Sequence, residues 1–261
     1  MSDLDEGKMA FLDHLGELRT RIVWSLIPTL VGVLVAFRFS DIIIKFISRP
    51  LTKGGSQLVF LAPTEAFWTS MKVSMIVGLF LAMPVILWQV WAFIAPGLHK
   101  HERRYAAPFV LIGSLLFLGG GAFALLVVVP FAISFLVGFG QAQGIKDMIS
   151  VSNHVDFVIK FTVAFGVVFE LPLAITMLSK MGLVTPQFLA RNRKYAILVN
   201  FIVAAILTPT PDILNQSLMA GPLIILYEVG IIAARVFGKR SPKAAAPFEA
   251  AAASSDAERS P

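Results

Sequence analysis

Carboxylates inside apolar stretches are the side chains of this sequence with the strongest potential for chemistry. Glu170 lies at the centre of residues 161–179, which carry no other charge. If this stretch crosses a membrane, the carboxylate costs about 2.5–3.5 kcal/mol on insertion scales, and such acids are functional by default. Glu170 would then be a docking point, a proton relay or an ion site. The alternative is a structural hydrogen bond to another span, and we favour function.

Two further acids, Glu17 and Glu102, are surrounded by bases. Glu17 precedes Arg21 by four residues, the spacing of an ordinary ion pair on a helix. Glu102 stands in the basic run 100–104, and charge balance is the simpler explanation of both acids. Together, however, two carboxylates can accept a guanidinium, whose planar donor fork they match. Glu228, in the last apolar run, either has a functional role or extends its carboxylate to the membrane surface by snorkelling, and the sequence does not decide between the two.

Composition excludes several classes of protein. Of the 261 residues, 57% are hydrophobic, or about 63% when glycine is counted and tyrosine is not, and 15% are charged. The corresponding apolar and charged shares of a typical soluble domain are about 45–50% and about 25%. This argues against a soluble enzyme, a disordered chain or a nucleic-acid-binding domain, and makes lipid the expected solvent. The absence of cysteine excludes disulfides and thiol chemistry. Since no metal-ligand spacing, phosphate loop or nucleophile motif occurs, we expect no metal, no cofactor and no enzymatic activity.

Uncharged runs predict an all-α polytopic membrane protein with six transmembrane helices. The run 105–140 exceeds the ~30 Å hydrocarbon core as one straight helix, so it must tilt, protrude or break near the glycines 119–121 or Pro130. The last two helices are short and would thin the bilayer or form a re-entrant hairpin. The expected spans are 22–39, 73–95, 108–136, 157–179, 195–208 and 216–234, within a membrane domain of residues 22–236.

The remaining segments are predicted to lie outside the hydrocarbon. Residues 1–21 favour an amphipathic helix at the cytoplasmic membrane surface, because apolar residues recur at helical spacing. The loop 39–72 is expected to form short helices and turns, and residues 237–261 a disordered cytoplasmic tail. Lys and Arg are about twice as dense in the stretches that include both termini as in the alternate loops, so both termini are predicted to be cytoplasmic.

Short motifs along the chain resemble those of the TatC family, the multispanning subunit of the twin-arginine protein translocase. The resemblance covers residues 11–235, with the motifs in the family's order. It rests on HLGELRTR at 14–21, WAFIAPGL at 91–98 followed by KHERR at 100–104, FELP at 169–172, LTP at 207–209 with Asp212 and Gln216, and Pro222 with Tyr227 and Glu228. One departure is an extra residue in TPTPD at 208–212, against a shorter TPPD in some members.

This resemblance implies a receptor that binds signal peptides with two consecutive arginines at the cytoplasmic face of the inner membrane. With single-span TatA- and TatB-type partners in a multimeric complex, such a receptor exports folded proteins using the proton-motive force. By similarity, Glu17 and Glu102 would contact the paired guanidiniums. The side chains that would shape that surface are Arg19, Phe93 and Leu98.

The resemblance also implies a second, membrane-embedded site on the concave face of a glove-like bundle. There Glu170, Thr208 and Gln216 would meet polar groups of the partner helices. Positions that match the family in a structural role are Pro50, Phe67, Pro172 and Asp212.

A proton-coupled small-molecule transporter with Glu170 as its relay is the alternative function. Such transporters usually show internal repeats and broken helices around a midplane cavity. No convincing repeat occurs in this sequence, which favours the translocase.

Overall fold

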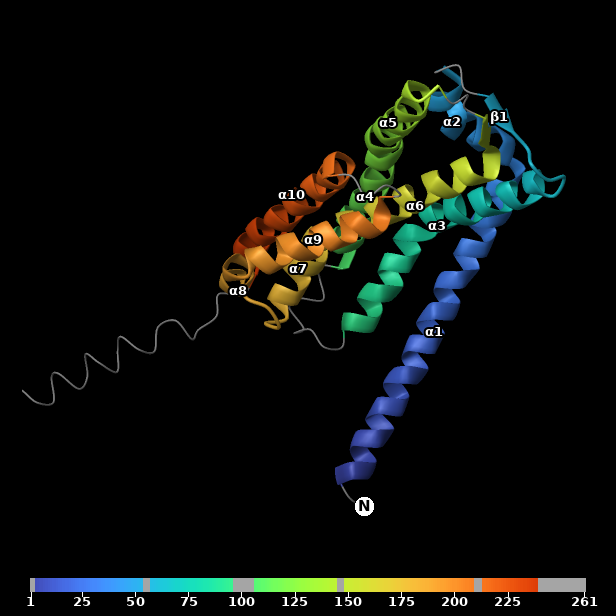
Figure 1. The fold of residues 1–261 in the computed structure, drawn as a ribbon. Helices are drawn as coiled ribbons and strands as arrows, with labels where there is room; N and C mark the ends of the chain where they lie inside the picture. Colours follow the sequence, from blue (N-terminus) through green and yellow to red (C-terminus); the bar gives the residue numbers. More distant parts are fainter. Residues whose placement is uncertain (1–2, 54–56, 96–105, 145–147, 209–212, 239–261) are drawn as a thin grey trace, which may run out of the picture.

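The computed structural model describes residues 3–53, 57–95, 106–144, 148–208 and 213–238 (Figure 1). The helices are α1 (Asp3–Arg38), α2 (Ser40–Lys53), α3 (Glu65–Ile94), α4 (Ala106–Phe123), α5 (Val129–Ala142), α6 (Val151–Phe169), α7 (Leu171–Lys180), α8 (Pro186–Arg191), α9 (Arg193–Leu207) and α10 (Ile213–Phe237). A π-helical segment (Ala124–Val128) joins α4 to α5, and the strands are β1 (Gln57–Val59) and β2 (Met148–Ser150).

Six helical segments in this part of the chain confirm the predicted all-α polytopic membrane fold, and they form a concave, glove-like bundle (Figure 1). The segments long and apolar enough to cross a membrane are Leu15–Arg38, Glu65–Ile94, Ala106–Ala142, Val151–Lys180 and Met219–Phe237. The remaining segment, α9, has 15 residues, or about 22 Å of helix against a ~30 Å hydrocarbon core. α10 has 25 residues and extends past the expected span 216–234 at both ends.

The two ends of the chain differ from the predicted domain limits. The surface helix expected at 1–21 is not a separate element, because α1 runs without interruption to Arg38. Its glycines (Gly7, Gly16 and Gly32) and Pro28 are weak points for a helix, and none of them ends it. At the other end α10 takes in Phe237, while the predicted disordered tail lies almost wholly outside the described residues.

The third membrane segment is continuous, but its hydrogen-bonding pattern changes from α-helical to π-helical and back. It covers 37 residues, about 55 Å of helix, so it must protrude from a ~30 Å core. The π-helical turn comes directly before α5, which has Pro130 in its first turn. Proline cannot donate to the carbonyl four residues earlier, and a wider π turn accommodates such a missing bond.

Close helix crossings in the bundle occur at glycines. A Cβ built on Gly32 of α1 would lie 2.9 Å from the carbonyl oxygen of Gly78 on α3. A Cβ on Gly120 of α4 would collide with the carbonyl oxygen of Phe165 on α6. Small residues let helix backbones approach in this way inside membranes.

α6 is the central element of the core. Val155, Phe161 and Phe165 are at most 1% exposed, and they belong to one apolar cluster with Val128 and with Leu223 of α10. Since α6 leads into residue 170, this packing sets the position of the intramembrane carboxylate.

A small sheet covers one end of the bundle, which we call the sheet end. β1 and β2 pair in parallel, with Val59 opposite Ser150 at their carboxyl ends, and α2 lies beside them (Figure 1). A three-residue strand is too short to show an alternating pattern, so the sequence predicts short helices and turns in 39–72 but not β1. The opposite end carries the start of α1, the end of α3 and α8 (Figure 1).

Two family positions lie at the sheet end. Pro50 is inside α2. Phe67 is in the first turns of α3, where its ring meets Phe37 edge-on at 6.4 Å and Trp68 at 5.8 Å between centroids.

Candidate functional site

Glu17 lies on α1, toward the end of the bundle opposite the sheet. Its Oε1 accepts a hydrogen bond from the Arg21 guanidinium at 3.1 Å, and both side chains are about one-third exposed. The same guanidinium donates to Oε1 of Gln89 on α3 at 3.2 Å. The predicted helix ion pair is therefore present, and Gln89, which the sequence did not single out, anchors it to the neighbouring helix.

Other residues of the predicted peptide site are only partly placed. Arg19 is exposed on α1, and Phe93 is half-buried in the last turn of α3. Glu102 and Leu98 lie outside the described residues, so the predicted pairing of the two acids stays a prediction. Nearby, the buried Trp91 ring packs on Phe109 of α4 at 4.7 Å between centroids, which fixes the end of α3.

Glu170 lies at a break in the fourth membrane segment. The predicted single helix over 157–179 is two helices, because α6 ends at Phe169 and α7 begins at Leu171. Pro172 in the first turn of α7 has no N–H to give to Val168, which interrupts the helical ladder at this point.

The Glu170 carboxylate is enclosed by three helices. A Cβ on Gly113 of α4 would lie 3.3 Å from Oε2 of Glu170, 2.7 Å from Leu87 of α3 and 2.9 Å from Leu173 of α7. Oε1 is buried and has no hydrogen-bond partner among the residues that the structure describes. Because an unsatisfied buried oxygen is costly, the site is suited to accept a donor from outside these residues.

Thr208 and Gln216 are both hydrogen-bonded to the backbone of α9. The Thr208 hydroxyl donates to the carbonyl of Ala204 at 2.9 Å. Nε2 of Gln216 on α10 donates to the carbonyl of Phe201 at 3.1 Å and so ties α10 to the short helix. Asp212 lies outside the described residues.

Glu228 forms an ion pair with a residue that the sequence did not indicate as its partner. Its Oε2 accepts from the Arg193 guanidinium at 2.7 Å, which joins α10 to the start of α9. The adjacent Tyr227 hydroxyl donates to the carbonyl of Leu189 in α8 at 3.0 Å. Together these bonds hold α8 and α9 against α10.

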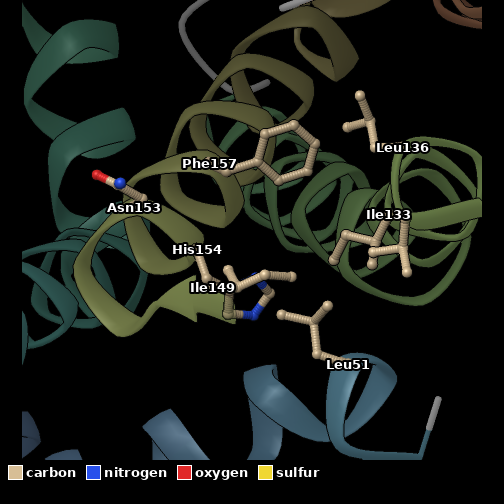
Figure 2. A pocket seen from close by; sticks show the side chains of 8 residues that line it. Leu51, Ile133, Leu136, Ile149, Asn153, His154 and Phe157 are labelled. Carbon is tan, nitrogen blue, oxygen red and sulfur yellow. The ribbon is translucent and has the colours of Figure 1, made fainter. Parts of the chain in front are cut away.

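An apolar cavity of about 160 Å³ lies at the sheet end between α2, α5 and α6 (Figure 2). Leu51, Ile133 and Phe157 line it together with His154, whose Nε2 is 3.1 Å from the carbonyl oxygen of Ile47. His154 precedes Glu170 by about 24 Å along the chain's helical rise. This cavity is therefore not the midplane cavity around Glu170 that a small-molecule transporter would need.

Comparison with known proteins identifies the family. A family profile described as "Sec-independent protein translocase protein (TatC)" matches residues 13–222. Proteins named Sec-independent protein translocase protein TatC are 43% identical in Desulforapulum autotrophicum, over 90% of this chain and 88% of that protein, and 40% identical in Carboxydothermus hydrogenoformans, over 89% and 95%. This chain belongs to the TatC family.

Solved TatC structures agree with the fold. A crystal structure titled twin arginine translocase receptor TatC covers 85% of this chain and 98% of its own, with 40% identity and a TM-score of 0.75. A second, titled as the same receptor in DDM, covers 87% and 100%, with 41% identity and a TM-score of 0.77. The recognition of TatC motifs in the sequence is thus confirmed, and the small-molecule transporter finds no support among these relatives.

Proposed function

We propose that this TatC chain is the receptor subunit of a twin-arginine translocation system. It binds the signal peptides of folded precursor proteins and, with TatA- and TatB-type single-span partners, exports them across the inner membrane, driven by the proton-motive force. The observation that carries the proposal is the 40% identity, over 85% of this chain, to the solved twin-arginine translocase receptor.

The Glu17–Arg21 pair supplies a physical route to peptide recognition. Its carboxylate already accepts a guanidinium at 3.1 Å, so a peptide arginine can replace Arg21 with the same geometry. The pair is about one-third exposed, which lets the incoming side chain reach it. Gln89 accepts a bond from the displaced Arg21, so the exchange leaves that cation with a partner. Glu102 takes the second arginine, and Arg19, Phe93 and Leu98 shape the surrounding surface.

This arrangement requires both termini to be cytoplasmic. The end of the bundle at which α1 begins also carries α8 (Figure 1). α8 ends at the basic Arg191 and follows Lys180 at the end of α7. Basic residues are retained on the cytoplasmic side of membrane proteins. The sheet end then faces outward.

Glu170 is the proposed contact for partner helices. Its buried Oε1 has no partner among the described residues, so a polar group of a neighbouring span can satisfy it. Thr208 at the end of α9 and Gln216 in α10 are proposed to meet partner helices in the same role. The 15-residue α9 favours a locally thinned bilayer, which lowers the barrier where partners gather. Since one chain of six spans cannot enclose a folded protein, the partners supply the passage.

Peptide binding tests the proposal. We expect the double variant Glu17→Ala/Glu102→Ala to bind a labelled twin-arginine peptide at least about tenfold more weakly, because each charge-assisted hydrogen bond contributes about 1.5–3 kcal/mol. Crosslinking of the peptide to the detergent-solubilised protein measures it. Glu228→Ala is the matched control, since this acid also pairs with an arginine but belongs to the α9–α10 contact. Unchanged crosslinking to the double variant would overturn the assignment.

A further inference from the structure

Glu65, at the start of α3, is a buried carboxylate that neither proposed site uses. The residue is only 9% exposed, and a buried charge is costly unless its oxygens are hydrogen-bonded. Oε1 accepts from the Ser150 hydroxyl and from the N–H of Ser152 at 2.8 Å. Oε2 accepts from the N–H of Leu61 at 2.6 Å and of Ala62 at 3.4 Å. One side chain thus joins the turn after β1, the start of α3 and the junction of β2 with α6.

The bonds of Glu65 close the carboxyl end of the sheet. Val59 and Ser150 form the last register pair of β1 and β2. The groups that donate to Glu65 lie just after Val59, in Leu61 and Ala62, on one side and at Ser150 on the other. Strands of three residues are marginal by themselves. The carboxylate therefore holds together a sheet that its own ladder would hold weakly.

A second polar contact repeats the connection two helical turns further along α3. Lys72 Nζ donates to both carboxylate oxygens of Asp156 on α6, at 2.7 and 2.8 Å. It also approaches the Ser152 hydroxyl at 3.4 Å. Ser152 consequently donates its N–H to Glu65, and its hydroxyl oxygen accepts from Lys72, which joins the two contacts into one network between α3 and α6.

The first turns of α6 are fixed on another side as well. His154 bonds to the carbonyl of Ile47 in α2 at 3.1 Å, and Figure 2 shows His154 and Asn153 pointing to different sides of α6. The start of α6 is thus held between α2 and α3. Its far end leads to the break at Glu170.

We propose that Glu65 is a positioning residue, whose carboxylate locks the sheet end and fixes the start of α6 against α3. Acting through α6, it sets where Glu170 meets partner helices, and this last consequence rests on the proposed function. A simpler role for an acid in the first turn of a helix is interaction with the helix dipole. Such a role would not involve the N–H groups of the preceding turn, nor the start of α6.

A charge swap between Glu65 and Ser150 separates these roles. Ser150 is the N-cap of α6 and accepts from the N–H of Asn153 at 3.3 Å. Aspartate is an equally good N-cap, so Ser150→Asp keeps that function but places a second carboxylate against Glu65. The double variant Glu65→Ser/Ser150→Asp restores one carboxylate facing one hydroxyl.

Hydrogen exchange of the purified full chain measures the outcome over 57–65 and 148–156. We expect Glu65→Ser and Ser150→Asp each to speed exchange at least about tenfold, and the double variant to return most of the protection. Asp41→Asn, which removes an exposed acid from the first turn of α2, should change nothing. The proposal would be overturned if Glu65→Ser exchanged as slowly as the unmodified chain. It would also be overturned if the double variant exchanged as fast as the faster of the two single variants.

If a single variant fails to fold, the amount of each variant protein in the membrane is measured instead of hydrogen exchange. Normal accumulation of the double variant then supports the proposed role of Glu65, and failure of the double variant to accumulate overturns it. Peptide crosslinking and export of a twin-arginine cargo are measured on the same four proteins. The four proteins can show the expected loss and return of exchange protection while the unmodified chain binds no twin-arginine peptide. That result refutes the proposed function and leaves the role of Glu65 standing.

Discussion

Glu170 differs from Glu17 and Glu65 in what surrounds its oxygens. Glu17 accepts from an arginine on its own helix, and Glu65 accepts from donors on three segments. Oε1 of Glu170 is buried without a partner among the described residues. A site of this kind gains most from an incoming donor, because the desolvation cost of its oxygen is already present before the donor arrives.

Replacing Glu170 separates partner assembly from peptide binding. We expect Glu170→Ala to weaken co-purification of single-span partners at least about tenfold, because a buried charge-assisted hydrogen bond is lost. Glu170→Gln keeps one acceptor oxygen and should retain part of the association. Crosslinking of the twin-arginine peptide should be unaffected in both. Normal partner recovery and export with Glu170→Ala at equal expression would contradict the assignment.

Sequence reasoning found the residues whose type is unusual for their surroundings and missed those whose role depends on distant segments. Glu170 stands alone in an apolar run, and the spacing of Glu17 and Arg21 predicts their contact. The carboxylate of Glu65 meets Ser150 across 85 positions of chain, which local spacing cannot indicate. Gln89 was missed for the same reason.

At the scale of elements, breaks and crossings were harder to predict than helices. Apolar runs gave six segments, but Pro172 divides one into α6 and α7, whereas Pro130 is absorbed by a π turn and leaves the third segment continuous. The same residue type thus has two different outcomes in this chain. The run 119–121 was expected as a possible break and instead supplies a close crossing at Gly120.

Adjacent glycines provide a matched test of that crossing. We expect Gly120→Ala to destabilise the bundle by about 1–3 kcal/mol, because its Cβ would collide with the Phe165 carbonyl and overpacked cores cost this much. Gly119→Ala meets nothing within 4 Å and should be neutral or slightly stabilising. Thermal unfolding in detergent measures both. Equal melting temperatures for the two variants would show that α4 and α6 do not meet at this point.

For the whole molecule, the proposed orientation assigns opposite sides of the membrane to two exposed positions. Met148 at the sheet end is 68% exposed, and Leu183 in the turn after α7 is 65% exposed. The chain has no cysteine, so Met148→Cys and Leu183→Cys each carry a single thiol. We expect a membrane-impermeant maleimide added outside to label only Met148→Cys, with both labelled after permeabilisation. The reverse pattern would invert the topology.

The pairing of α1 with α3 has a consequence for how the protein is made. α1 packs chiefly on α3, and only 11% of its apolar window is buried. The Gly32–Gly78 contact can therefore form once α3 has left the ribosome, and α1 is surrounded by lipid until then. β1 lies between these two helices in the chain and Glu65 is the first residue of α3, yet their partners at β2 and α6 follow much later. The first hairpin can thus assemble early in synthesis, while the sheet end is completed only after the fourth segment enters the bilayer.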